Sequence, residues 1–465
     1  MKTEIISRTC IKPSIPTPPH LKTFTFSLLD QLCTSVHANM TFFYPSNGDD
    51  SVSKFSSKSH RLQRSLCQTL THFYPLAGRL QDSASIVCND DGAYFIEAKT
   101  DGSLSEFLSK PNTTVLEKFL PSTDPETEKI SNGSLFLVQF TLFSCGGTAV
   151  SISHSHKIVD LAALLIFLKS WTAASRGNEE PEVPDFCGAS LLPPREIPSI
   201  SGASSLINHA PPKFVAKRFV FEASKIADLR ARVVGAGSTA GQEFQPSRGE
   251  LVLAVIWKCA MAASNTKSKS GSSTSLSSAT FQPSALFQGM DLRTKMEPPL
   301  PETVFGNFMW PFFVVLENER DMELHVMVRN MRKAMNDFLI NKVNTFKGDE
   351  AFSTIMDSLK EREEVLKKKT GLKVYKCSSG CKFPLNETDF GWGKPAWFTS
   401  LNKLVSNTIT LFNTKSGGVE AFVTLDEEDM AIFEKDEMLL SYASLNPSIS
   451  LLPYNTSNDF RFSKL

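Results

Sequence analysis

The chain has 465 residues, and its 49 Lys and Arg residues balance 49 Asp and Glu residues. This zero net charge argues against a dedicated binder of nucleic acid or of anionic membranes, while it leaves room for a local basic patch. Hydrophobic residues make up 41% and charged residues 21%, which is ordinary for a globular protein of two or three domains.

The N-terminal segment and the cysteines indicate a cellular compartment. Residues 1–20 contain no apolar stretch typical of a signal peptide, and the apolar run Leu161–Leu168 is too short to span a bilayer. Nine scattered cysteines fit a reducing environment. We therefore expect a cytoplasmic protein without a membrane segment.

Hydrophobic periodicity predicts both strands and helices in the first part of the chain. The expected elements are a strand at 3–10, a strand end and turn at Phe24–Leu32, a helix at 61–72, a hairpin over Ile86–Ala98 and a strand at Leu135–Phe143. Seven prolines then punctuate the stretch from Gly177 to Pro212, which predicts a long crossover or interdomain linker.

The part after the linker again mixes the two kinds of element. We expect a strand at Ala216–Phe221, helices near Ser224–Val233 and Gly249–Ala263, two helices within 321–369, strands within 396–424 and a helix at Asp426–Met438. The Ser- and Lys-rich stretch Asn265–Ser278 is expected to be a loop. The sequence therefore predicts an α/β protein with an N-terminal domain at 1–180, a linker at 181–212 and a C-terminal domain at 213–465.

A strand-to-helix junction carries the first candidate site. Apolar and polar residues alternate over Val150–Ser153, and leucines recur at helical spacing from Leu161 onward. His156 and Asp160 form an HxxxD pattern between the two elements. Such a junction can hold an imidazole at the end of a rigid strand, facing a cleft.

An isolated HxxxD more often has a structural meaning. Asp160 is well placed to cap the helix that follows, and His156 could be an ordinary core histidine. The two side chains could also bind a metal, but His154 is the only further ligand type close by. Since no second cluster of His, Cys or Asp completes a site, we predict no metal.

The second motif is DFGWG, residues 389–393. Two glycines that alternate with bulky aromatic residues indicate a tight backbone turn rather than the interior of a strand. DFG also occurs in protein kinases, but no glycine-rich phosphate loop or HRD element accompanies it here. The glycines of Gly235–Gly241 follow a helix and have the wrong spacing for a dinucleotide-binding loop, so we expect a flexible loop there.

HxxxD followed by DFGWG resembles the plant BAHD acyltransferases, which transfer an acyl group from coenzyme A to an alcohol or amine. Gln245–Ala263 and the DLR…PPLP…GN segment at Asp291–Asn307 are similar to further segments of that family, so the resemblance covers nearly the whole chain. It implies a two-domain fold like that of chloramphenicol acetyltransferase, with a channel between the domains. It also implies a monomer without a permanently bound cofactor, which uses acyl-CoA, and by preference acetyl-CoA, as co-substrate.

The resemblance also implies roles for the motif residues. His156 would be the general base, because a neutral imidazole with an ordinary pKa of about 6.5 can take the hydroxyl proton, an effect worth roughly 10²–10⁴-fold. Asp160 would turn away from the substrate and pair with Arg293, in a structural role. The DFGWG residues would support the CoA channel without taking part in the chemistry: Asp389, Phe390, Gly391, Trp392 and Gly393.

CoA is anionic, so a chain of zero net charge must supply local cations to bind it. Lys267, Lys269 and Lys394 are candidates, and the alternative for each is a solvated surface lysine. Balanced charge gives no reason to expect a nucleic acid among the partners, which should be acyl-CoA and a small hydroxylated acceptor.

Two positions depart from the family pattern. Leu161 stands where members usually have Gly or Ala, and this larger side chain could narrow the channel. Gly380 stands where members often have a Trp on the acceptor side, so the acceptor pocket could be enlarged or an oxyanion donor lost. Ser378 or Ser379 could supply a hydroxyl donor instead.

SHKIVD and the C-terminal motif resemble most closely the branch that acetylates alkaloids and terpenoid-like alcohols. The function expected is therefore O-acyl transfer, most readily of acetyl, onto a hydroxyl of such a plant metabolite. Two alternatives stay open, which are a sugar or other alcohol as acceptor with a different acyl-CoA, and an inactive relative that acts as a binding protein.

Overall fold

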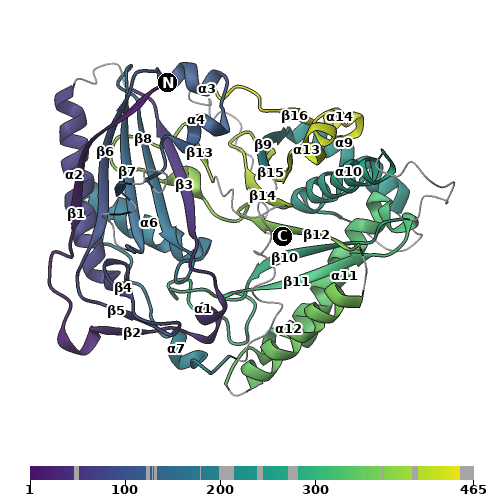
Figure 1. Ribbon diagram of the computed structural model, residues 1–465, viewed down its shortest axis with the longest axis horizontal. Coiled ribbons are helices and arrows are strands. Elements are labelled where there is room, and N and C mark those ends of the chain that lie inside the picture. Colours follow the sequence, from purple (N-terminus) through teal and green to yellow (C-terminus); the bar gives the residue numbers. More distant parts are fainter. Residues whose placement is uncertain are drawn as a thin grey trace.

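The computed structural model describes residues 1–46, 52–121, 126–127, 129, 133–177, 180–197, 214–237, 245–270, 281–348, 350–368, 371–400 and 407–450. Two halves lie side by side, each built around one mixed β-sheet (Figure 1). Helix α2 runs along the outer edge of the first half, and α12 along the lower edge of the second. The predicted α/β fold with two sheet-rich domains is confirmed.

The first half contains a six-stranded sheet in the order β1-β6-β7-β8-β3-β13. Only the pair β6 and β7 is parallel among its described strands. A small second sheet, β2-β5-β4, lies in the same half. The strands are β1 Thr3–Ile11, β6 Ala93–Thr100, β7 Phe136–Phe143, β8 Thr148–Ser155, β3 His37–Tyr44, β13 Trp397–Thr399, β2 Thr23–Thr25, β5 Ser85–Val87 and β4 Arg79–Leu80.

Two long helices cover the first sheet. The predicted spacing of Leu62, Leu66 and Leu70 lies on α2, and all three are buried in the core that also contains the apolar face of α6. Gly177 ends α6 in a left-handed conformation with a φ of 74°, as glycine allows. The helices of this half are α1 Leu28–Leu32, α2 Val52–His72, α3 Leu104–Ser109, α4 Thr113–Glu117, α6 Leu161–Arg176 and α7 Gly188–Leu191, with 3₁₀ turns η1 Pro19–Leu21 and η2 Tyr74–Ala77.

The second half contains a seven-stranded sheet in the order β11-β10-β12-β14-β15-β9-β16. Its strands are β11 Met309–Leu316, β10 Ser284–Asp291, β12 Lys373–Ser379, β14 Thr408–Asn413, β15 Val419–Asp426, β9 Phe214–Phe221 and β16 Ala443–Leu445. Its helices are α9 Ala223–Gly237, α10 Arg248–Ser270, α11 Leu324–Asn341, α12 Glu350–Lys368, α13 Glu427–Phe433 and α14 Glu437–Tyr442, with 3₁₀ turns η4 Glu319–Met322, η5 Val343–Thr345 and η6 Leu385–Glu387. Its core lies between the sheet and helices α9, α10, α11, α13 and α14.

Residues 385–399 come late in the sequence but pack with the first half. Strand β13 pairs antiparallel with β3, and Leu385, Phe390 and Trp397 are buried in the core of the first sheet. DFGWG therefore lies against the first half, although the sequence suggested that the C-terminal domain carries it. The ranges predicted for the two domains stay a prediction.

Three local predictions were wrong. The segment Ile86–Ala98 is no hairpin, because β5 pairs with β2 and β4 while β6 pairs with β1 and β7 in the other sheet. The segment expected to be a loop from Asn265 is helical as far as Ser270, because α10 continues to that residue, and the rest of it lies outside the described residues. The expected turn within Phe24–Leu32 is the short helix α1, which is stabilised by a capping box.

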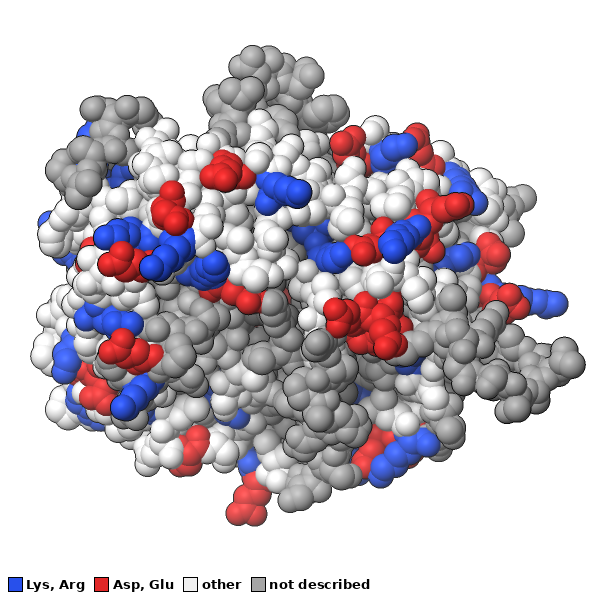
Figure 2. Space-filling model, turned by 45° about the horizontal axis from the view of Figure 1, so that its top comes forward, with Lys and Arg blue, Asp and Glu red and all other residues white. Residues whose placement is uncertain are grey.

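The surface of the described residues carries both signs of charge. On the face in Figure 2, acidic and basic side chains are interspersed, as the balanced composition suggested. Within the described ranges, no helix combines the length and the apolar character that a bilayer crossing requires.

Candidate active site

His156 begins the turn that links β8 to α6. Strand β8 is paired on both sides, with β7 and β3, so its end is rigidly placed. The backbone N–H of His156 donates to the carbonyl of Val36 at 2.9 Å, and Asp160 caps α6 by accepting from Ala163 N at 2.8 Å. The His156 side chain is half-buried, while those of its neighbours Ser155 and Lys157 are buried.

The nearby His154 differs from His156 in its surroundings. It is 5% exposed, and its Nδ1 has no hydrogen-bond partner among the described residues. Burial, followed by the neighbouring His156 and His37, lowers the pKa of His154 to about 3. His154 is therefore neutral at physiological pH and too weakly basic to hold a proton during a reaction.

The ion pair expected between Asp160 and Arg293 is present. Arg293 Nη1 lies 2.9 Å from Asp160 Oδ2, and Nη2 lies 3.2 Å from Oδ1, so the contact is bidentate. The two side chains are only 2% and 3% exposed. Asp160 also accepts hydrogen bonds from the backbone N–H groups of Ala163 and Phe308, at 2.8 and 3.0 Å. Both carboxylate oxygens are thus engaged by groups other than the His156 ring.

Arg293 also binds the loop that follows it. Its Nε donates to Val304 O and its Nη2 to Gly306 O, both at 2.9 Å, and its Nη1 contacts Asp291 Oδ1 at 3.0 Å. The guanidinium therefore links α6 of the first half to the 304–308 loop, next to β10 and β11 of the second. A buried guanidinium in such a network is expected to fix the loop rather than to move protons.

Asn307 in that loop contacts the His156 backbone, which sequence reasoning missed. Its Nδ2 donates to the His156 carbonyl at 3.0 Å and to Asp30 Oδ1 at 2.9 Å. The Asn307 backbone N–H also donates to Asp30 Oδ1, at 2.7 Å. The pattern of Ser27 followed by Asp30 resembles a capping box and could have pointed to α1. Asn307 ends the family-like segment Asp291–Asn307, but no sequence pattern indicated its contact with His156.

DFGWG forms a turn around the Asp389 carboxylate. Asp389 Oδ1 accepts from the backbone N–H groups of Gly391 and Gly393 at 2.7 and 2.9 Å. These glycines have φ values of 104° and 106°, which other residues rarely adopt. The predicted tight backbone turn is therefore confirmed.

This turn lies at the opposite end of α6 from Asp160. Ser175 Oγ donates to Phe390 O and Arg176 Nη1 to Asp389 O, each at 2.7 Å. Because a helix rises about 1.5 Å per residue, sixteen residues separate the two motifs by about 24 Å. The buried Phe390 packs edge-on against Trp171 at 4.7 Å, and Trp392 stacks on Phe390 at 5.7 Å. DFGWG thus does not contact the HxxxD turn.

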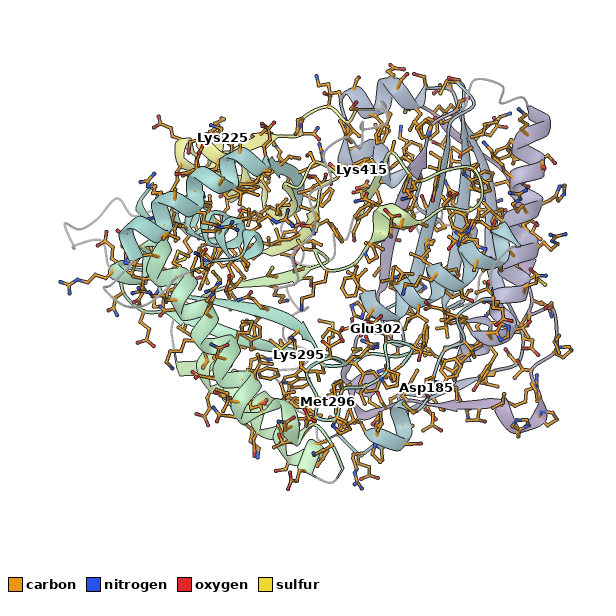
Figure 3. The ribbon with its side chains drawn as sticks, turned by 180° about the vertical axis from the view of Figure 1, so that it is seen from behind. Asp185, Lys225, Lys295, Met296, Glu302 and Lys415 are labelled. Carbon is orange, nitrogen blue, oxygen red and sulfur yellow. The ribbon has the colours of Figure 1, made fainter. Side chains whose placement is uncertain are left out.

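The candidate cations for CoA lie in different places. Lys394 forms an ion pair with Glu387, and both side chains are more than half exposed. Lys267 and Lys269 lie at the end of α10, but their side chains are outside the described part of the structure. Lys415, which sequence reasoning missed, lies where the second half meets the first (Figure 3) and donates to Pro395 O at 2.6 Å. Burial, followed by Lys394, lowers its pKa.

The two positions that depart from the family pattern lie close together. A Cβ on Gly380 would lie 2.3 Å from Cε1 of Phe412 and 3.1 Å from Cδ2 of Leu161. The Phe412 ring and Leu161 therefore fill the space where a larger residue 380 would stand. The enlarged pocket that we considered at Gly380 is therefore closed where Phe412 and Leu161 lie. Ser378 and Ser379, at the end of β12, are exposed.

The chain is similar to known proteins over nearly its whole length. A model of the Transferase family matches residues 1–440. The limonoid 7-O-acetyltransferase of Citrus sinensis is 36% identical over 471 residues, covering 96% of this chain and 99% of that protein. The BAHD acyltransferase BIA1 of Arabidopsis thaliana is 34% identical over 463 residues, with coverage of 96% and 99%.

Solved structures show the same likeness. The crystal structure of vinorine synthase superposes with a TM-score of 0.78 at 31% identity, over 96% of this chain and 99% of that one. TRI101 of F. sporotrichioides, crystallised with coenzyme A and T-2, has a TM-score of 0.65 at 17% identity, over 91% and 99% of the two chains, and shares the fold. The chain therefore belongs to the Transferase family of BAHD acyltransferases.

Proposed function

We propose that this acyltransferase moves an acyl group, most readily acetyl, from CoA onto a hydroxyl of a plant alkaloid or terpenoid. His156 acts as the general base. The observation that carries this proposal is the position of His156, half-buried at the end of a rigid strand, in a turn held by both halves. The relative named a limonoid 7-O-acetyltransferase supports an acetyl donor and a terpenoid-type alcohol.

The chemistry needs one base and no covalent intermediate on the protein. The His156 imidazole takes the hydroxyl proton as the acceptor oxygen attacks the thioester carbon, and the tetrahedral oxyanion then expels the CoA thiolate. The imidazolium returns its proton to that thiolate. His154 is a poor substitute, because its lowered pKa leaves it too weakly basic for the first step.

Asp160 and Arg293 have a structural role in this proposal. Both oxygens of Asp160 are engaged by Arg293 and by backbone N–H groups, so Asp160 holds the turn. Lys394 directly follows the DFGWG segment and Lys415 binds the carbonyl of Pro395, so these two lysines are the candidates to bind the phosphates of CoA. The channel between the halves, a monomeric state and a cytoplasmic location belong to the same proposal.

The first experiment measures thiol release from acetyl-CoA with a panel of hydroxylated alkaloids, terpenoids and sugars. We expect acceptor-dependent release by the wild type and a loss of at least roughly 10²-fold in His156→Ala. His60→Ala, at an exposed position of α2, is the control and should match the wild type. Release that survives in His156→Ala would exclude His156 as the base.

The alternatives give different outcomes. Release with another acyl-CoA, or with sugars alone, would keep the acyltransferase and change its substrates. If no combination gives release, calorimetric binding of CoA would separate an incomplete panel from a chain that binds nothing. CoA binding without transfer by any donor and acceptor would support an inactive relative that acts as a binding protein.

A further inference from the structure

Asp30 is a buried carboxylate whose described hydrogen bonds all come from neutral donors. Its Oδ2 accepts from Ser27 N at 3.1 Å and Ser27 Oγ at 2.7 Å. Its Oδ1 accepts from the backbone and side chain of Asn307 at 2.7 and 2.9 Å. Burial is the main cause that raises the pKa of Asp30 to about 6. A site that keeps such an unfavourable group is expected to use it.

Asn307 connects this carboxylate to the candidate base. Its amide group donates both to Asp30 and to the carbonyl of His156, so one side chain spans the two. Gly306 permits the close approach, because it has a φ of 131° and a Cβ there would lie 3.3 Å from Asp30 Oδ2. The three residues come from separate regions, 277 and 151 positions apart in the sequence.

The HxxxD turn, which begins at His156, also contacts α1 at a second point. Lys157, next to His156, donates to the carbonyls of Gln31 and Cys33 at 2.8 and 3.1 Å. The Lys157 ammonium therefore binds the end of α1, while Asp30 lies within that helix. The backbone at His156 and Lys157 is thus linked to α1 twice, by the Lys157 side chain and by the Asn307 side chain.

We propose that Asp30 is a positioning residue, which holds Asn307 against the His156 carbonyl and thereby sets the direction of the imidazole. This inference rests on the proposed role of His156 as the base. The Asp160–Arg293 pair fixes the last residue of the turn, and Asp30–Asn307 fixes its first. A base displaced by about 1 Å can cost about 10²-fold in rate, so the anchor of the first residue bears directly on catalysis.

The test compares Asn307→Ala, Asp30→Ala and Asp30→Asn with Ser27→Ala as the matched control. Asn307→Ala removes the amide that bridges Asp30 and His156. Asp30→Asn keeps an oxygen that can accept from Asn307. Ser27→Ala removes a hydroxyl from the other carboxylate oxygen and leaves the bonds to Asn307 intact.

The first readout is the kinetics of thiol release with an acceptor that the panel identifies. We expect kcat to fall at least about tenfold in Asn307→Ala and Asp30→Ala, while KM for acetyl-CoA stays within about twofold. Asp30→Asn should recover most of kcat, and Ser27→Ala should keep it. Thermal melts identify any variant that does not fold, and Asn307→Ala and Asp30→Asn still test the proposal if Asp30→Ala fails.

The second readout needs no acyl transfer. In protein labelled with ¹³C-histidine, the His156 ring signal is assigned by its loss in His156→Ala. We expect its chemical shift to change in Asn307→Ala and to stay unchanged in Ser27→Ala. A changed ring signal without thiol release in the wild type would leave the positioning role intact and count against the proposed function.

Two results would overturn the proposal. One is an Asn307→Ala protein with the kcat and the His156 ring signal of the wild type. The other is an equal loss of kcat in Ser27→Ala at matched melting temperature, because Asp30 would then act only through the general stability of α1.

Discussion

An aspartate lies at each end of helix α6, and the two carboxylates are stabilised in different ways. Asp160, at the N-terminus, is buried and pairs with Arg293 from the second half. Asp389, in the DFGWG turn that contacts the C-terminal end of α6, is half-buried and accepts from the backbone N–H groups of its own turn. The HxxxD turn therefore depends on how the two halves meet, whereas the DFGWG turn depends mainly on local geometry.

The largest expected effect comes from breaking the ion pair. Arg293→Ala would leave Asp160 charged and buried without its partner, so we expect a loss of about 3–5 kcal/mol in the free energy of unfolding. Arg176→Ala, at the other end of α6, removes a hydrogen bond to a backbone carbonyl and should cost about 1 kcal/mol. Chemical denaturation measures the free energy of unfolding of both variants. Equal losses would contradict the view that the HxxxD turn depends more on the contact between the halves.

The second largest effect is expected where Gly380 and Phe412 of the second half pack next to Leu161 of α6. Gly380→Ala places a methyl group against the Phe412 ring, and overpacking of this kind costs about 1–3 kcal/mol. The double variant Gly380→Ala, Phe412→Leu should recover part of the loss, because the smaller side chain frees the space. Denaturation midpoints measure the stability of the single and the double variant. A double variant no more stable than Gly380→Ala would refute a clash between residue 380 and the Phe412 ring.

A third, smaller loss of stability is expected in the DFGWG turn, where glycine is needed for the backbone conformation. Gly391→Ala forces a side chain onto a φ of 104°, which we expect to cost about 1–2 kcal/mol. The methyl group would also meet the end of Arg61, a flexible side chain that can move aside. KM and kcat for thiol release should change little while the melting temperature falls. A large loss of kcat at full stability would show that the turn takes part in catalysis.

The smallest effect is expected at the surface. Lys394 and Glu387 are exposed, so Lys394→Ala should change the free energy of unfolding by no more than about 1 kcal/mol. A raised KM for acetyl-CoA at unchanged stability would assign Lys394 to CoA binding. An unchanged KM would leave it a solvated surface lysine, and Lys415→Ala would then be the next variant to measure.

Sequence periodicity predicted the elements that depend on neighbours in the chain. The leucine spacing of α2 and α6 and the capping position of Asp160 are visible in the sequence itself, so they could be read directly. The alternation in β8 predicted a strand but not its burial, because all its residues are buried. The DFGWG turn could be predicted for the same reason, since its hydrogen bonds span two and four residues. The resemblance to the family, rather than any spacing, suggested the partner of Asp160.

Tertiary structure decided which distant segments meet. Asp160 and Arg293 are 133 residues apart, and Asp30 and Asn307 are 277 apart, so no local pattern brings them together. The predicted hairpin at Ile86–Ala98 failed because two adjacent strands joined different sheets, and β13 joined the first sheet from far along the chain. Periodicity tells which face of an element is buried, but the choice of partner is made by packing across the whole fold.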